Sequence, residues 1–337
     1  MKNRVLLPFE ENPYNQMFHN SAFPMGIIQG NANCDIKPWL ASKYINCYYR
    51  PGNTFDICMK DKWFSEDGKL IQQRIIMTED GYRALSLDYL DLLREMLSLG
   101  CYVGGAYNEE YIPGKWCYQK AYYGHDYLLI GYDNDKEEFY SVGYLADKKF
   151  QRFTIPYDCM RRSLETLQRT DIYFNFWKYN ENAIYEFDME TMLDELYDYI
   201  HSVTSVKGFA PAYLGMQALY ELTNYFLGSV EDGRNVDFRY TRGILEHKFF
   251  MMNRVDHLTK ITDIDLSEFK QKSIEVYKMA ERAHLLGLKY LMTGNISIVK
   301  NLVDLIHKML EIEGQYLPQL YDSIIRFQKK GGAYGKQ

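Results

Sequence analysis

The spacing of apolar residues changes near residue 180 of this chain. Before that point, short helix-like and strand-like patterns follow one another, whereas from about residue 185 apolar residues recur every three or four positions. The second pattern predicts amphipathic helices that pack together. We therefore predict a mixed domain over residues 1–180, a helical domain over residues 181–330 and a frayed, flexible tail over residues 331–337.

The first half contains a helix and a series of strand-like segments. Ser86 can cap the start of a helix through LDYLDLLREMLSLG, and Gly100 lies just past its end. Two of the strand-like segments flank residues 134–136, which is typical of an antiparallel hairpin. A second helix is expected around Asp158–Leu167. The strand-like segments are CYVGGAY, HDYLLIGYD, EEFYSVGYL, FQRFTI and DIYFNFWKY. A helix followed by antiparallel strands, without βαβ alternation, indicates an α+β fold.

Composition narrows the class of protein. With 337 residues, of which 47% are hydrophobic and 25% charged, the chain has the profile of a globular protein. A net charge of −6 is unlike the basic footprint of a nucleic-acid binder, so we expect no nucleic-acid partner. The six cysteines are irregularly spaced and form no CxxC pair, which argues against a zinc site or a disulfide framework.

Neither export nor membrane insertion is predicted. The N-terminus MKNRVLLPFEENPYNQ has only a short apolar run before a proline and then acids, unlike a signal peptide. The longest apolar stretches fall far short of the ~20 residues that a membrane span requires. We therefore expect a cytoplasmic protein with reduced thiols and no membrane partner.

His125 is the candidate general base of the first half. It directly follows a glycine at the start of a strand-like segment, where its ring can lie at the rim of a sheet. Tyr122, Tyr123 and Tyr127 would shield the ring from water, and a nearby carboxylate would stabilise its charged form. The structural alternative is a histidine that is simply hydrogen-bonded at a strand end.

Hairpin pairing indicates which acid would orient His125. In a hairpin whose turn is centred at residues 135–136, two residues lie opposite each other when their numbers sum to about 271. His125 then faces Ala146, beside Asp147, which would be the third member of a catalytic triad. Asp133 is the rival, although it lies eight residues along the same strand, roughly 26 Å away. Asp147 can equally be a solvated turn residue.

Cys34 is the candidate nucleophile. It follows a Gly/Asn-rich loop and precedes a helix-like run that begins near Pro38. A thiol near a helix N-terminus is favoured as a thiolate by the unpaired backbone N–H groups, although Pro38 would leave Cys34 a few residues outside the helix. Gln29 could direct its amide at a developing oxyanion, as could the Cys34 backbone N–H. Packing is the alternative for Cys34 and the expectation for the other five cysteines.

Three blocks of the first half resemble a known family. They are LSLGCYVGGAYNEE, KPWLASKYINCYY and YIPGKWCYQKAYYGHDYLLIGYDNDKEEFYSVGYLADKKFQRFTIPYD. Over about residues 10–180 the chain resembles the N-terminal domain of butirosin biosynthesis protein H and its relatives, which include the amide-forming enzyme of closthioamide assembly. The resemblance implies a papain-like, cysteine-peptidase-like fold. It places the family's histidine at His125, whereas an alternative alignment matches the nucleophile segment to YNQMFHNSAFPMGII, which contains no cysteine.

The resemblance also implies a reaction. An acyl group would leave a carrier-protein phosphopantetheine thioester, pass to Cys34 and be captured by an amine as an amide, with Asp147 supporting His125 and Gln29 in the oxyanion hole. The expected partners are an acyl or peptidyl carrier protein and an amine. A thioester is already activated, and the chain has no GxxxxGK[ST] phosphate loop, so no bound cofactor is expected.

Two other functions remain open. The same residues could serve a cysteine peptidase or a thioesterase, with water in place of the amine. A papain-fold relative without its nucleophile would be a binding or scaffold protein. Metal catalysis is not expected, because His247 and His257 lack ligand spacing. The helical half could build a substrate wall, a carrier-docking surface or the interface of a homo-oligomer.

Overall fold

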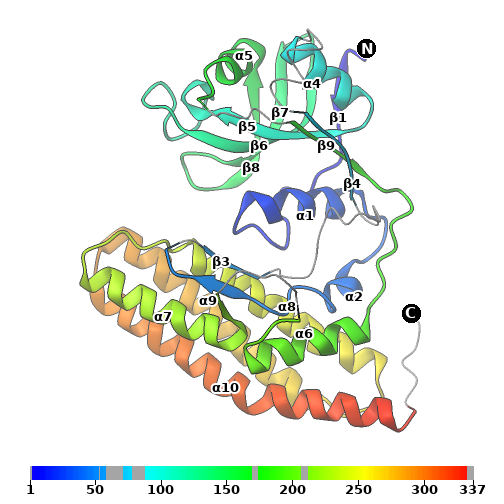
Figure 1. The fold of residues 1–337 in the computed structure, drawn as a ribbon, viewed down its shortest axis with the longest axis vertical. Helices are drawn as coiled ribbons and strands as arrows, with labels where there is room; N and C mark the ends of the chain where they lie inside the picture. Colours follow the sequence, from blue (N-terminus) through cyan, green and yellow to red (C-terminus); the bar gives the residue numbers. More distant parts are fainter. Residues whose placement is uncertain are drawn as a thin grey trace. The chain divides into compact units, whose positions relative to one another are not determined.

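The computed structural model describes residues 2–52, 54–57, 71–77, 88–168, 174–205 and 212–331. The chain forms two compact units, each built from two stretches of sequence (Figure 1). The first unit comprises Met1–Cys34 and Lys62–Ile184, and the second comprises Asp35–Asp61 and Tyr185–Gln337. The sequence pattern predicts a single boundary near residue 180. The structure differs, because the early segment Asp35–Asp61 belongs to the helical unit.

An antiparallel sheet forms the centre of the first unit. Its strands are ordered β4-β9-β5-β6-β7-β8, and β1 also pairs with β6. The strands are β1 (Arg4–Leu6), β4 (Ile71–Met77), β5 (Tyr102–Asn108), β6 (Gly124–Asp133), β7 (Glu138–Tyr144), β8 (Phe150–Pro156) and β9 (Phe174–Tyr179). The predicted mixed α+β class and the five strand-like segments, which form β5 to β9, are thereby confirmed.

The predicted β6–β7 hairpin is also confirmed in its register. Tyr132 lies opposite Phe139, which gives the expected sum of 271. An irregularity between Leu129 and Gly131 shifts the pairing by one position, so Leu128 faces Val142. His125 lies beyond the paired part of this hairpin and pairs instead with Tyr107 on β5.

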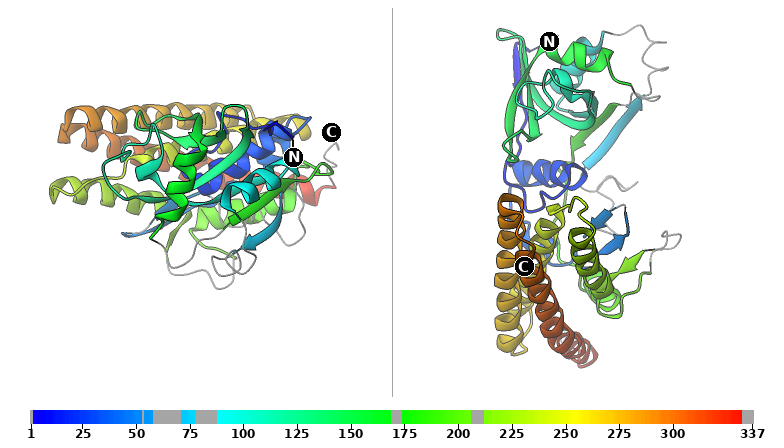
Figure 2. Two further views of the ribbon diagram at one scale, coloured as in Figure 1. Left: turned by 90° about the horizontal axis from the view of Figure 1, so that it is seen from above. Right: turned by 90° about the vertical axis from the view of Figure 1, so that its left-hand side faces the viewer.

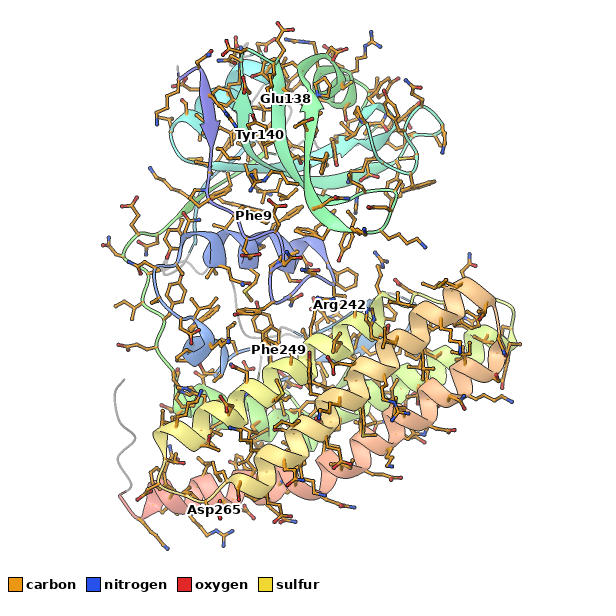
Figure 3. All side chains as sticks on the ribbon, turned by 180° about the vertical axis from the view of Figure 1, so that it is seen from behind. Phe9, Glu138, Tyr140, Arg242, Phe249 and Asp265 are labelled. Atoms are coloured by element: carbon orange, nitrogen blue, oxygen red, sulfur yellow. The ribbon has the colours of Figure 1, made fainter. Side chains whose placement is uncertain are left out.

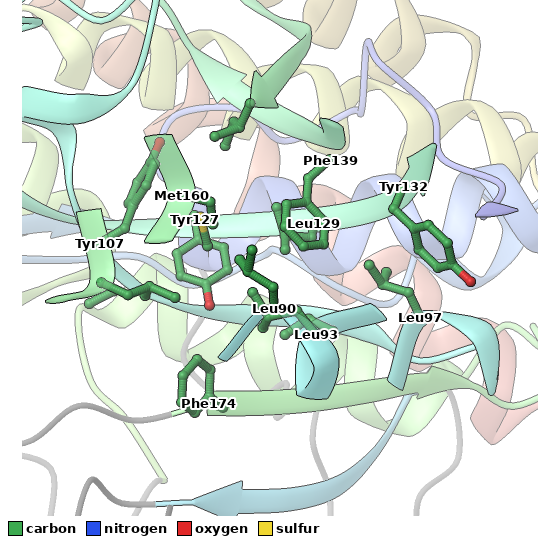
Figure 4. Packing of buried hydrophobic residues seen from close by; sticks show 14 of the residues in the cluster. Leu90, Leu93, Leu97, Tyr107, Tyr127, Leu129, Tyr132, Phe139, Met160 and Phe174 are labelled. Atoms are coloured by element: carbon green, nitrogen blue, oxygen red, sulfur yellow. The ribbon is translucent and has the colours of Figure 1, made fainter. Parts of the chain in front are cut away.

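Helices cover both faces of this sheet. On one face α4 (Tyr89–Ser98) and α5 (Tyr157–Glu165) pack against apolar strand residues such as Tyr127 and Leu129 (Figure 4). The side chain of Asp88 caps α4, whereas Ser86 lies outside the described residues. On the opposite side α1 (His19–Asn31) contacts β6 and β9 (Figure 1).

Helix α1 was missed by the periodicity argument because it has no polar face. Every residue from Ser21 to Ile28 is buried, and the helix contains Pro24. The N-terminal segment packs closely on it, with Phe9 beside the helix (Figure 3). A Cβ atom on Gly26 would lie 2.1 Å from the Phe9 ring, so only glycine permits this approach.

The second unit is built mainly from the helices that the periodicity predicts. Its helices are α6 (Met189–His201), α7 (Gly215–Glu231), α8 (Arg239–Ile261), α9 (Ser267–Thr293) and α10 (Ile296–Lys329). Helix α9 packs against both α8 and α10 (Figure 2). A small sheet with the strand order β10-β2-β3 adds to the unit, from β2 (Tyr48–Arg50), β3 (Thr54–Asp56) and β10 (Tyr213–Leu214).

The helix expected after Pro38 is much shorter than predicted. Only α2 (Lys37–Leu40) forms, and the chain then turns along α8. The buried Arg254 guanidinium donates to the carbonyls of Ala41, at 2.8 Å, and Lys43, at 2.7 Å. A continued α2 would need these carbonyls for its own hydrogen bonds, but the Arg254 side chain of α8 uses them. Tertiary contacts therefore override the local preference of this segment for helix.

A buried ionic cluster joins three helices of the second unit. Lys248 Nζ lies 2.6 Å from Glu313 Oε2 and donates to the Tyr199 hydroxyl at 2.9 Å. That hydroxyl donates to the same carboxylate oxygen at 2.8 Å. All three side chains are almost completely buried, so each charge depends on the other for its stabilisation.

We expect Lys248→Met to lower the free energy of unfolding by about 3–5 kcal/mol, because it leaves a buried carboxylate without its cation. The double variant Lys248→Met/Glu313→Leu should recover most of that loss, since neither charge remains. Urea unfolding followed by circular dichroism measures both, with the exposed Lys300→Met as a control expected within about 0.5 kcal/mol of the parent. Equal losses in the single and double variants would contradict the role of the ion pair.

Candidate active site

The end of β5 and the start of β6 bring Glu109 next to His125. The side chain of Asn108 accepts hydrogen bonds from the backbone N–H groups of Glu110 and Tyr123, which turns the chain sharply at the strand end. The Glu109 N–H donates to the Tyr123 carbonyl at 2.8 Å. These bonds fix the backbone on both sides, so the Glu109 side chain points inward and is only 2% exposed.

The Glu109 carboxylate has three side-chain partners. Oε1 lies 2.8 Å from His125 Nδ1 and 3.1 Å from Lys115 Nζ. Oε2 accepts from the Cys117 thiol at 3.7 Å. Lys115 also donates to the Tyr144 carbonyl at 2.7 Å, which ties this loop to β7. The carboxylate therefore connects the loop at residues 109–123 to two strands.

The charges in this cluster hold Glu109 in its ionised form. Burial by itself would raise the pKa of Glu109, but the hydrogen bond from His125 and the charge of Lys115 outweigh it, so the pKa is lowered from its ordinary value. Burial lowers the pKa of Lys115, and the Glu109 carboxylate opposes that effect. Burial raises the pKa of the Cys117 thiol to about 11, and Glu109 adds to the rise.

An ionised carboxylate fixes which nitrogen of His125 can act as a base. A carboxylate only accepts hydrogen bonds, so Nδ1 must carry the hydrogen that points at Glu109. In the neutral ring, the lone pair then lies on Nε2. The side chain is 35% exposed, so the ring is accessible to a ligand while its orientation is held from the buried side. This is the arrangement that general-base catalysis requires.

A second imidazole lies against the first. His19 is the first residue of α1, and its ring centroid is 4.7 Å from that of His125. The His19 ring also stacks on Phe23, at 4.7 Å, and on Tyr144, at 5.8 Å. Gly143 lies beside this ring, since a Cβ atom on it would be 3.4 Å from His19 Nε2, an ordinary van der Waals contact. Sequence reasoning did not single out His19, although it lies in the segment of the cysteine-free alignment.

The structure does not bring Cys34 to His125. Cys34 is exposed and lies three residues beyond Asn31, where α1 ends, whereas His125 contacts the first residue of that helix. Thirteen residues at 1.5 Å each separate the two ends of α1 by about 20 Å. Gln29 is near the same far end, where its Oε1 accepts from the Tyr14 N–H at 2.7 Å. Neither side chain therefore joins the histidine site.

The acids proposed from hairpin pairing also lie elsewhere. Asp147 is an exposed turn residue that accepts from the Lys149 N–H and the Gln151 amide. Asp133 lies at the far end of β6 and accepts from the Tyr140 hydroxyl. Glu109, rather than Asp147, is the acid that contacts His125. It could have been found only by pairing β5 with β6, whose long connection does not fix the register.

The other cysteines are poorly placed for nucleophilic chemistry. Cys117 is buried and contacts Oε2 of Glu109, whereas His125 contacts Oε1. Cys47 and Cys101 are buried, and burial raises the pKa of Cys47 to about 12. Burial also raises the pKa of Cys159, while Cys58 lies outside the described residues.

Within the described ranges no group of three or more histidine, cysteine or acidic side chains is arranged to hold a metal ion. The same ranges contain no helix that is both long enough and apolar enough to span a membrane. No protein-family model matches the chain, and no curated protein matches it. The geometry of the site and the sequence resemblance are therefore the basis for inferring a function.

The lowered pKa of Glu109 predicts a pH-dependent contribution to stability. An ionised, paired Glu109 stabilises the fold above its unfolded pKa of about 4.3, and this contribution is lost as the pH falls through the lowered folded value. Glu109→Gln should therefore lower the free energy of unfolding by about 3 kcal/mol at pH 7. The difference between parent and variant should shrink below about pH 4.

Urea unfolding of both proteins from pH 3 to pH 7 measures this difference. Asp147→Asn is the matched control, because that carboxylate is exposed and accepts hydrogen bonds from Lys149 and Gln151, which are close to it in sequence. A Glu109→Gln effect that is independent of pH would show that the carboxylate charge contributes nothing.

Proposed function

We propose that the protein is an acyltransferase that moves an acyl group from a carrier-protein thioester to an amine and forms an amide. The contact between His125 and the buried Glu109 carboxylate carries this proposal, because it orients a partly exposed imidazole as a general base. The resemblance to amide-forming proteins of natural-product assembly supports the choice of reaction. No cofactor is required, since the thioester supplies an activated acyl group.

The transfer is proposed to be direct. As the amine nitrogen attacks the thioester carbonyl carbon, His125 Nε2 accepts a proton from the amine. The carbon–sulfur bond then breaks, and His125 returns the proton to the departing pantetheine sulfur. The histidine ends the cycle as it began, and the products are an amide and a free thiol.

This scheme departs from the acyl-enzyme expected through Cys34. The supporting observation is that the helix start beside His125 carries His19, while Cys34 lies past the other end of the same helix. The alignment that matches the nucleophile segment to YNQMFHNSAFPMGII agrees with this placement, because α1 begins inside that segment. A cysteine is therefore not assigned to the reaction.

The same base could activate water, in which case the product would be the free acid. A binding or scaffold role is the second candidate, and the placement of Cys34 away from His125 is the observation that favours it. Turnover separates the three functions, because only the transferase converts the amine, the thioesterase releases acid, and the scaffold leaves the thioester intact.

We expect His125→Ala to reduce amide formation by about 10²–10⁴-fold, the usual contribution of a general base. Glu109→Gln should also reduce it, because an amide can hold Nδ1 in the wrong protonation state. Mass spectrometry of an acyl-pantetheine thioester incubated with primary amines measures the product. Cys34→Ser and Asp147→Asn should retain the parental rate.

Intact-mass spectrometry of the protein provides the opposing test. A covalent acyl adduct on Cys34, together with loss of product in Cys34→Ser, would restore the acyl-enzyme route and reject direct transfer. Acid without amide would indicate hydrolysis. An unchanged thioester, with retained binding, would favour the scaffold role.

A further inference from the structure

Aromatic side chains are exposed beside His125. Trp116 is 57% exposed and Tyr123 is 41% exposed, and both belong to the first unit. A single exposed apolar residue needs no explanation, but neighbouring rings at the edge of a candidate site are typical of a binding surface.

The rings form a connected series that reaches the base. The Trp116 and Tyr123 centroids are 5.5 Å apart at an interplanar angle of 65°. The Tyr123 and His125 centroids are 5.4 Å apart at 50°. His19 continues the series on the buried side of His125. A planar group resting on Tyr123 would therefore lie next to the His125 imidazole, and one resting on Trp116 would lie one ring farther away.

The backbone presents Trp116 outward for a definable reason. Its two neighbours, Lys115 and Cys117, are both buried and both contact the Glu109 carboxylate. With both flanking side chains held inward, the side chain between them must point to solvent. Backbone bonds from Lys115 to Ile112 and from Gln119 to Glu110 hold the loop in this form.

We propose that Trp116 and Tyr123 form a binding surface for an aromatic group of the substrate. The proposal rests on the proposed function for the position of the reacting atoms, but the binding itself does not require turnover. Covering these rings with a planar group would remove apolar surface from water and add ring-to-ring contact. The aromatic group could belong to the acyl donor or to the amine.

Binding titrations distinguish the two sources. The donor arm compares S-benzoyl-N-acetylcysteamine with S-acetyl-N-acetylcysteamine, and the acceptor arm compares benzylamine with methylamine. In at least one arm the aromatic compound should bind about three- to tenfold more tightly, the value of one aromatic pair. The arm that shows this preference identifies the substrate that carries the ring.

Trp116→Ala should abolish the preference, and Trp116→Phe should retain part of it. Ile184→Ala is the matched control, because it removes an exposed apolar side chain of the same unit and should leave the preference intact. Trp116 is largely exposed, so the circular dichroism spectrum should not change. Absence of a Trp116-dependent preference in both arms would overturn the proposal.

The same titrations on His125→Ala separate this proposal from the proposed function. The aromatic preference should persist in that variant even though turnover is lost. Binding that depends on Trp116, without any amide or acid product in the parent, would reject the transferase and leave the binding surface standing. Turnover with no aromatic preference would reject the binding surface alone.

Discussion

The buried carboxylate of Glu109 is the constraint on which the histidine site depends. A carboxylate this enclosed is tolerated only with a cation and hydrogen-bond donors around it. Lys115 supplies the cation, and His125 supplies a donor from the next strand. Lys115 also donates to the Tyr144 carbonyl on β7. The buried Glu109 carboxylate therefore holds the loop and the imidazole directly, and it holds β7 through Lys115.

Local rules were sufficient for the β6–β7 hairpin and for the helices of the second half. Each of those depends on residues close in sequence, either a short turn or a three-to-four spacing. Helix α1 could not be found in this way, since Ser21–Ile28 is buried throughout and offers no polar face. Glu109 was missed for a different reason, because the connection from β5 to β6 is too long to set a register.

Cys34 was predicted as the nucleophile because a helix N-terminus favours a thiolate, but this rule was applied to the wrong helix. A helix N-terminus does lie beside His125, but it is the start of α1 and carries His19. The helix that follows Cys34 is α2, which has only four residues and contributes little of the dipole that would favour a thiolate. Its shortness arises from Arg254, which takes the backbone carbonyls after it. A contact some two hundred residues away in sequence thus shapes the chain that follows Cys34.

Two buried glutamate–lysine pairs in the described part of the chain show what separates a structural cluster from a candidate site. In the helical unit, Lys248 and Glu313 share a third partner, Tyr199, that is as buried as they are. In the first unit, the third partner is His125, whose ring reaches the surface. Both pairs consist of a lysine and a glutamate, but only the Glu109–Lys115 pair places its carboxylate against an accessible imidazole. That difference in exposure, rather than the ion pair itself, makes the first unit the place to look for catalysis.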